Sequence, residues 1–155
     1  MKKLFLLILI MPAICFGQLY SKKELLNLTL TSSLCFVGGA FDGTTETLKF
    51  HYSQFEKVFP NANKQFWGPS YSWKNKWKNH DYTQGEKFYQ SSRSLVFTTD
   101  AYHLMRTGRT ICVMSAITFK FGQKKKWYKY AIDIGANYLS YTVGFAFAYD
   151  VVFKP

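Results

Sequence analysis

The sequence has few cysteines and none of the short motifs that identify a reaction. It contains no nucleophile elbow, phosphate-binding glycine loop or zinc-protease helix. Of its three cysteines, Cys35 and Cys112 lie in apolar runs, without a second cysteine or a histidine at the close spacing of a metal site. We expect both to be buried thiols, with a disulfide between them as the alternative.

The N-terminus has the order of residues typical of a secretory signal peptide. A basic start and an apolar run fill residues 1–11, and Cys15 and Gly17 are small residues at the positions that signal peptidase requires for cleavage before Gln18. Lipidation of Cys15 is a weaker interpretation, because a bulky isoleucine precedes it. An uncleaved anchor is disfavoured, because the run is shorter than the ~20 residues that cross a bilayer. We expect a signal peptide over residues 1–17 and a single helical domain over residues 18–155, exported to the periplasm or the membrane-associated cell envelope.

Acidic side chains are scarce as well. The whole chain has nine acidic and 20 basic residues, and the part after residue 17 keeps all nine acidic and 18 of the basic ones, a net charge of +9. For an exported protein this excess favours anionic lipid or other anionic envelope components as partners. Nucleic acid is not expected, because that pool is cytoplasmic.

The first helix is predicted from its capping residues and its apolar run. Ser21 and Glu24 have the spacing of a capping box, and residues 25–41 carry no charge. This run is marginal for a membrane-crossing helix and suits a buried one. Gly38-Gly39 favours close approach of another helix, and the helix is expected to continue to about Val58, just before a proline.

The rest of the chain predicts shorter helices and one ambiguous segment. Apolar elements are expected over residues 88–105 and 111–121, with a turn at residues 107–110 between them. Residues 139–153 alternate apolar and small or polar side chains, which is typical of a strand in an outer-membrane barrel. The same segment has small residues every fourth position, a ridge that lets helices pack closely. Because no other segment has the repeated alternation that a barrel needs, we predict an all-α, membrane-associated bundle of about four helices with a long aromatic loop, and keep a β-barrel-like C-terminal strand as the alternative.

The long loop over residues 60–85 mixes tryptophan with lysine. Indole rings and ammonium groups together are typical of a membrane interface, where they meet anionic headgroups. The same mixture suits stacking on sugars, and the plainer interpretation is that the tryptophans close the end of the bundle. The candidate surface-binding residues are Trp67, Trp73, Lys74, Lys76, Trp77 and Lys78.

Ionisable side chains within apolar sequence are the other candidates for function. Carboxylates with an Asp-x-x-His pair can bind a metal ion between helices or act as an acid and base. More often such groups are hydrogen-bonded to hydroxyls or paired with arginines such as Arg93 and Arg106, which is the interpretation we favour. The catalytic candidates are Asp42, Glu46, Asp100, His103 and Asp133, with His51 a further choice, and the first four are also the metal candidates.

Several segments resemble uncharacterised small exported bacterial proteins of the cell envelope. They are Phe41-Asp-Gly43 through Glu46, Pro60-Asn-Ala-Asn63, Phe66-Trp-Gly-Pro-Ser70 to Trp73-Lys-Asn-Lys-Trp77, and Thr99-Asp-Ala-Tyr-His103. The pattern from Asp133 to Gly144 is loosely similar to periplasmic lipoproteins of unknown function. The resemblance covers about two thirds of the mature chain and implies no activity.

These observations favour an exported envelope or membrane-associated protein with a structural or interaction role. Its expected partners are anionic lipid, other envelope components or another envelope protein, and no cofactor is predicted. The alternatives are a metal-dependent or acid–base hydrolase-like enzyme built on the buried Asp, Glu and His cluster, in which a metal ion would be the cofactor, and a carbohydrate-binding module built on the aromatic loop.

Overall fold

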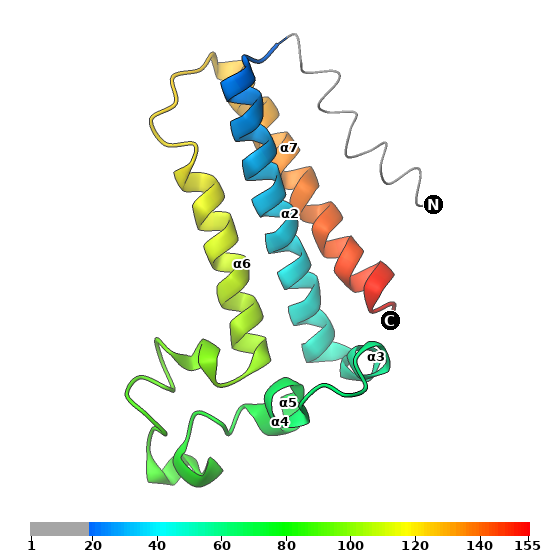
Figure 1. The fold of residues 1–155 in the computed structure, drawn as a ribbon, viewed down its shortest axis with the longest axis vertical. Coiled ribbons are helices and arrows are strands. Elements are labelled where there is room, and N and C mark those ends of the chain that lie inside the picture. The colour runs from blue at the N-terminus through cyan, green and yellow to red at the C-terminus, as the bar shows by residue number, and fades with distance from the viewer. Residues whose placement is uncertain (1–18) are drawn as a thin grey trace.

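The computed structural model describes residues 19–155, and the predicted signal peptide lies outside them. Three long helices, α2 (Lys22–Phe50), α6 (Ala101–Thr118) and α7 (Trp127–Ala146), make up most of the fold (Figure 1). α7 continues into a π-helical segment, η4 (Phe147–Val152). Between α2 and α6 lie α3 (Tyr52–Val58), α4 (Lys64–Trp67), α5 (Pro69–Ser72) and the 3-10 turns η1 (Lys78–His80), η2 (Tyr82–Gln84) and η3 (Val96–Thr98). No strand occurs in residues 19–155, so the predicted all-α class is confirmed and the C-terminal segment is helical.

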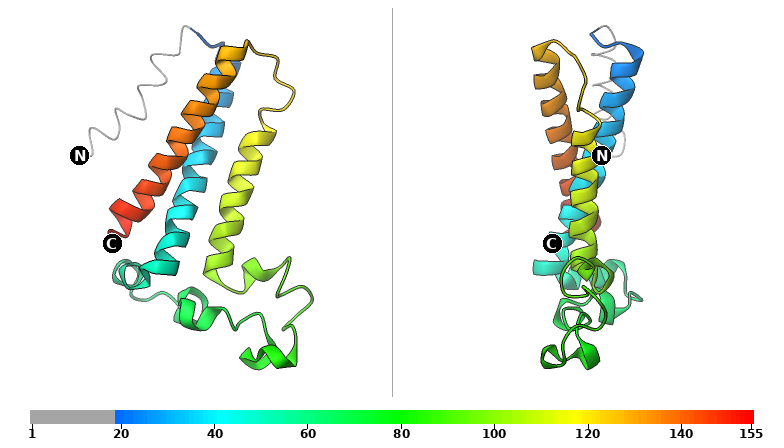
Figure 2. Two further views of the ribbon diagram at one scale, coloured as in Figure 1. Left: turned by 180° about the vertical axis from the view of Figure 1, so that it is seen from behind. Right: turned by 90° about the vertical axis from the view of Figure 1, so that its left-hand side faces the viewer.

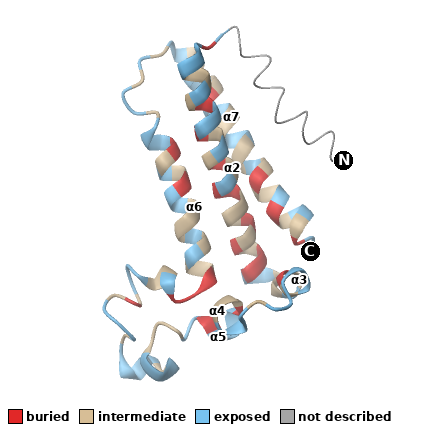
Figure 3. Cartoon of the chain, viewed as in Figure 1, coloured by how far each residue is buried: buried red, intermediate tan, exposed pale blue. Residues whose placement is uncertain are grey.

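The three long helices form an open layer, with α2 in the middle. α6 and α7 each pack along α2, on opposite sides of it, and hardly touch one another. α7 runs parallel to α2 and α6 runs antiparallel to it; the same arrangement is seen from behind and from the edge in Figure 2. Buried residues are therefore concentrated on α2 and thin out on the two flanking helices (Figure 3).

α2 begins as predicted and ends earlier than predicted. The Glu24 amide donates to Ser21 Oγ at 3.3 Å, and the Ser21 amide donates to Glu24 Oε2 at 2.8 Å, which is a complete capping box. The expected continuation to Val58 is interrupted at His51, whose φ of −135° and ψ of 40° are not helical. α3 starts after this break and carries Phe55 into the core at the foot of the layer.

Glycine backbones hold α2 and α7 together. A Cβ at Gly39 would lie 2.0 Å from the Tyr141 carbonyl oxygen, and a Cβ at Gly43 would lie 2.6 Å from that of Phe145. The predicted close approach at Gly38-Gly39 is therefore confirmed. Gly39 packs on the backbone of α7, whereas Gly38 faces α6, where a Cβ would lie 3.4 Å from the Cβ of Cys112.

The predicted turn at residues 107–110 is wrong, because α6 runs through it without a break. Gly108 is helical, and a Cβ there would come within 2.9 Å of the Phe41 ring. This glycine makes room for an aromatic ring of α2 and does not turn the chain. The element expected over residues 88–105 is mostly irregular, with only η3 before α6.

The best-packed apolar core lies at the foot of the layer. Its buried members are Leu48, Phe55, Ala101 and Phe153, contributed by α2, α3, α6 and the C-terminal segment. The Phe55 ring lies 5.6 Å from the ring of Phe153 and 4.9 Å from that of Trp67. The connecting segment is thus anchored to the layer at its start.

Candidate functional site

The predicted catalytic and metal residues lie at separate places in the layer. Within residues 19–155, no three His, Cys, Asp or Glu side chains come together in a group that could hold a metal ion. Asp42, Asp100 and Asp133 instead each have partners of their own, and the three sites differ in what those partners are.

The first site joins all three long helices. Asp42 of α2 forms an ion pair with Arg109 of α6, and the Tyr141 hydroxyl of α7 donates to Asp42 Oδ2 at 2.7 Å. Glu46, one turn further along α2, makes no hydrogen bond or ion pair in the described part of the chain. The arginine partner is Arg109, not Arg93 or Arg106, because Arg109 is the one that the antiparallel packing of α6 brings beside Asp42.

A groove of about 450 Å³ opens next to this ion pair, between α6 and α7. α2 forms its floor at Cys35, and Arg109 and Met114 line one wall while Asn137 and Tyr138 line the other. The groove exists because the two flanking helices do not meet. Cys35 and Cys112 are both buried and free, as expected, and the disulfide alternative is not formed here.

The second site is the start of α6. Asp100 is its N-cap, and its Oδ1 accepts from the His103 amide at 2.8 Å. The His103 ring Nδ1 lies 2.8 Å from both carboxylate oxygens of Asp100. The Asp-x-x-His pair that suggested a metal site is thus occupied with capping a helix, which accounts for the burial of Asp100.

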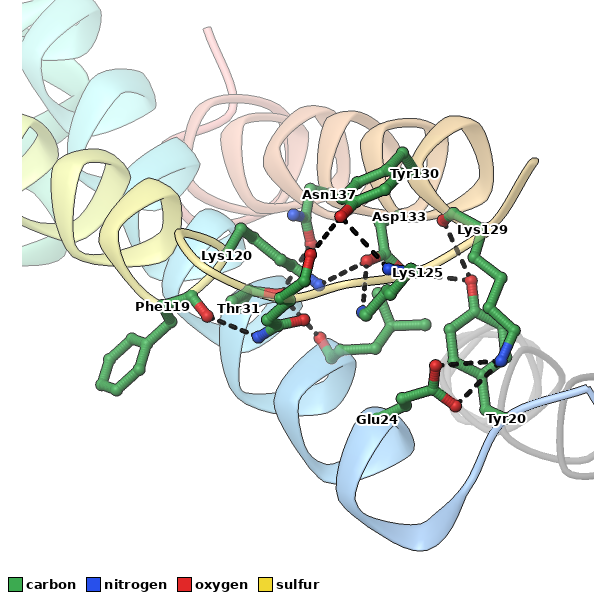
Figure 4. A network of polar contacts seen from close by, with 12 residues as sticks. Tyr20, Glu24, Thr31, Phe119, Lys120, Lys125, Lys129, Tyr130, Asp133 and Asn137 are labelled. Atoms are coloured by element: carbon green, nitrogen blue, oxygen red, sulfur yellow. Dashed lines mark hydrogen bonds and ion pairs between the residues drawn. The ribbon is translucent and has the colours of Figure 1, made fainter. Parts of the chain in front are cut away.

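The third site is a buried charge network at the opposite end of the layer (Figure 4). Asp133 Oδ2 accepts from Lys120 Nζ and Lys125 Nζ, each at 2.8 Å, and Asp133 Oδ1 lies 3.0 Å from the Tyr20 hydroxyl. Burial opposes ionisation of this carboxyl, but the two ammonium groups outweigh it and lower the pKa of Asp133. The side chain of Lys125 is only 2% exposed, so its buried positive charge requires the negative charge of this carboxylate.

A second ion pair ties the first turns of α2 and α7 at the same end. Lys129 Nζ donates to both carboxylate oxygens of Glu24 at 2.9 Å. The hydrogen bonds from Lys129 and from the Ser21 amide lower the pKa of Glu24 to about 2. The Tyr20 ring lies beneath both Lys125 and Lys129, with Nζ to ring-centre distances of 5.7 and 5.1 Å. Burial and the contact with Asp133 raise the pKa of Tyr20.

The six predicted surface-binding residues do not form one exposed patch. Trp67 is packed on Phe55, and Trp77 and Lys76 are half-buried where the chain pairs across the Trp77–Glu86 bridge. Only Trp73, Lys74 and Lys78 are exposed. The plainer interpretation, in which tryptophan closes the end of the bundle, holds for Trp67, while lipid binding by the exposed members stays a prediction.

Sequence reasoning missed the partners that organise these sites. It did not single out Arg109, Tyr141, Tyr20 or Lys120, because each is paired with a carboxylate on another element, between 13 and 113 residues away. Residues 123–126 form a cationic loop at the end that holds the Asp133 network, and no role was predicted for it. The signal for that end was present in its three consecutive lysines followed by Trp127.

No protein-family model, curated protein or solved structure matches this chain.

Proposed function

We propose that this chain is an exported, membrane-associated protein of the cell envelope with a structural or interaction role. The observation that carries the proposal is the apolar flank, which we define as nine of the large apolar side chains that the three long helices leave exposed. It consists of Leu26, Leu30 and Val37 on α2, Ile111, Met114 and Ile117 on α6, and Ile134, Tyr138 and Leu139 on α7.

Single exposed apolar residues are normal, but large apolar side chains left exposed on all three helices of one layer favour a surface that lipid or a partner covers. Leu26 is 68% exposed and Ile134 is 70% exposed, although each belongs to a helix whose other face is packed. A soluble helical bundle usually buries such side chains by closing around them. This layer stays open because α6 and α7 both pack along α2 and hardly touch one another.

Lipid acyl chains would cover the apolar flank without any further protein element. α2 is the one helix among the described residues that is long and apolar enough to cross a bilayer by length and composition, a property it shares with core helices of soluble proteins. Asp42 is paired with Arg109, and Asp133 is paired with two lysines, so the carboxylates between the helices are not left without counter-charges. These features support association with a membrane and require no catalytic step.

The proposal is tested by fractionating cells that express the full chain. We expect the protein in the membrane pellet after a high-salt wash and in solution only with detergent. Replacement of Leu26, Ile134 and Leu139 by Gln should release most of it, because burial of each such side chain is worth about 1.5–3 kcal/mol. The matched control replaces Tyr82 and Tyr89, exposed residues of the connecting segment, by Gln and should leave the distribution unchanged.

Recovery of the wild-type protein as a soluble monomer without detergent would overturn the proposal. A stable soluble dimer would overturn it as well, because a second copy would then cover the apolar flank in place of lipid.

A further inference from the structure

We infer that the end of the layer formed by the first turns of α2 and α7 and by the loop over residues 119–126 binds the anionic phosphate headgroups of a lipid bilayer. We call it the lysine end. The inference rests on the proposed membrane association and names the part of the molecule that meets the headgroups.

The lysine end holds a large share of the positive charge. Its seven lysines are opposed only by Glu24 and Asp133, which leaves five positive charges out of the nine carried by the chain after residue 17. The seven are Lys22, Lys23, Lys120, Lys124, Lys125, Lys126 and Lys129. The Glu24–Lys129 pair and the Asp133 network, which Figure 4 shows, hold all three segments together. The lysines that these segments carry therefore lie at the same end of the layer.

The lysines divide into a group that is paired with carboxylates and a group that is unpaired. Lys120, Lys125 and Lys129 are engaged with carboxylates. The other four are exposed, and their ammonium groups make no hydrogen bond or ion pair within residues 19–155. These four are Lys22, Lys23, Lys124 and Lys126.

The positions of the free lysines do not favour folding. Lys22 and Lys23 are the first two residues of α2, and Lys126 is the N-cap of α7. A cation at a helix N-terminus meets the positive end of the helix dipole, which disfavours it. These lysines are exposed and lie at positions where they do not stabilise the helices. Such charges are suited to binding an external anionic partner.

Exposed aromatic rings accompany these lysines. Phe121 is 75% exposed and Trp127 is 80% exposed, and both lie in or beside the loop that carries Lys124 and Lys126. Aromatic rings next to lysines are typical of the headgroup region of a bilayer, where the ring enters the apolar boundary and the ammonium meets phosphate. The apolar flank begins within the next two turns, at Leu26 on α2 and Ile134 on α7, so headgroup and acyl contacts follow one another along the layer.

The aromatic loop at the foot offers less net positive charge, because Asp81 and Glu86 lie within the same segment as its lysines. Its tryptophans differ in exposure: Trp67 is packed on Phe55, Trp77 is half-buried and Trp73 is exposed. Lysine variants at the lysine end are therefore expected to weaken vesicle binding more than lysine variants at the foot.

The experiment measures partition of the protein, residues 18–155, onto vesicles at low salt. One set is phosphatidylcholine alone, and the other is phosphatidylcholine and phosphatidylglycerol in equal parts. Each lysine near an anionic surface contributes about fivefold in partition, so replacement of Lys22, Lys23, Lys124 and Lys126 by Gln should weaken binding to the anionic vesicles by several hundredfold. Binding to the neutral vesicles should not change. The variant should fold, with an unchanged or raised Tm, since none of the four side chains is paired.

The matched control replaces Lys74, Lys76 and Lys78 by Gln and should weaken binding far less. Brominated lipid should quench the fluorescence of Trp127, and Trp127→Phe should remove this quenching while Trp73→Phe leaves it.

Equal binding to both vesicle sets would overturn the inference and leave the membrane association standing. A stronger loss of anionic-vesicle binding in the variant of Lys74, Lys76 and Lys78 would also overturn the inference, because it would show that the foot contacts the headgroups. Binding to a soluble anionic polysaccharide with no binding to either vesicle set would overturn both the inference and the proposed function.

Discussion

Gly144 of α7 lies so close to Phe36 of α2 that a Cβ at position 144 would be 2.0 Å from the Phe36 carbonyl oxygen. The contact is made by backbone, which cannot move aside as the end of a flexible side chain can. Gly39 makes the reciprocal contact with Tyr141 of α7. Both sides of the α2–α7 seam therefore require glycine.

Gly144→Ala or Gly39→Ala should lower the free energy of unfolding by about 1–3 kcal/mol, because the helices must separate to admit the methyl group. Gly135 is the control: it lies in the same helix with nothing within 4 Å of its would-be Cβ. Gly135→Ala should raise the free energy of unfolding by about 0.5–1 kcal/mol, since alanine favours the helix. Urea titrations followed by circular dichroism measure both, and a loss of stability in Gly135→Ala would contradict this account of α7.

Asp133→Asn should be the most damaging change in the charge network. It leaves the ammonium group of the buried Lys125 without a counter-charge, which costs about 3–5 kcal/mol. Lys120→Met should cost less, because Asp133 keeps Lys125 and Tyr20 as partners. Thermal unfolding of the two variants tests the order, and equal losses would show that the two lysines do not depend on one shared carboxylate.

Acid should weaken the tie between α2 and α7. The pKa of Glu24 is about 2 in the folded protein and 4.5 ordinarily, so the unfolded chain binds more protons between these values. The stability that this carboxylate contributes is complete above about pH 4.5 and is lost as the pH falls toward 2. Glu24→Gln should lower Tm at neutral pH and flatten its fall over this range, and parallel curves for the two proteins would refute the assignment.

Asp100 should act as a helix cap and not as a metal ligand. Asp100→Ala removes the acceptor for the His103 amide and should cost about 1–2 kcal/mol, whereas Asp100→Asn keeps an acceptor and should cost less. Chelator should leave Tm unchanged, and elemental analysis should find no stoichiometric metal. One equivalent of a transition metal, lost in His103→Ala, would restore the enzyme interpretation.

Two tryptophans of the aromatic loop should respond differently to replacement by alanine. Trp67→Ala removes a ring packed on Phe55 and should lower the free energy of unfolding by about 2–3 kcal/mol. Trp73→Ala should change it by less than about 0.5 kcal/mol, because that ring is exposed. Similar losses in denaturant titrations of the two variants would place Trp73 in the core.

Local signals were sufficient to predict the start of α2 and the helical character of α7. The Ser21 and Glu24 pair marked the start of α2, and the spacing of Ser140, Gly144 and Ala148 identified α7 as a helix that packs closely. The prediction of a turn at Gly108 was wrong because a glycine within a polar stretch is compatible with a turn and with a helix. The reason for glycine at this position is the Phe41 ring of α2, which the local sequence does not reveal.

The sites were less predictable because they are made across the layer. Hydroxyl and arginine partners were predicted for the carboxylates, and Asp42 has one of each. Arg109 and Tyr141 became its partners only through the register of α6 and α7 on α2. No local pattern encodes that register. The lysine partners of Asp133 were not predicted. The two lysines that meet on Asp133 depend in the same way on how the loop over residues 119–126 returns to α7.

The position of α2 between its neighbours also shapes how the chain must fold. Asp42 and Arg109 are separated by 67 residues, and the pair Tyr20 and Asp133 by 113. Helical proteins usually fold quickly because their contacts are local, but α2 gains either neighbour only after a long loop has closed. We expect slow folding for an all-helical chain, with an early state in which α2 is formed and its glycine face is bare. That state is the one in which the chain is most exposed to aggregation.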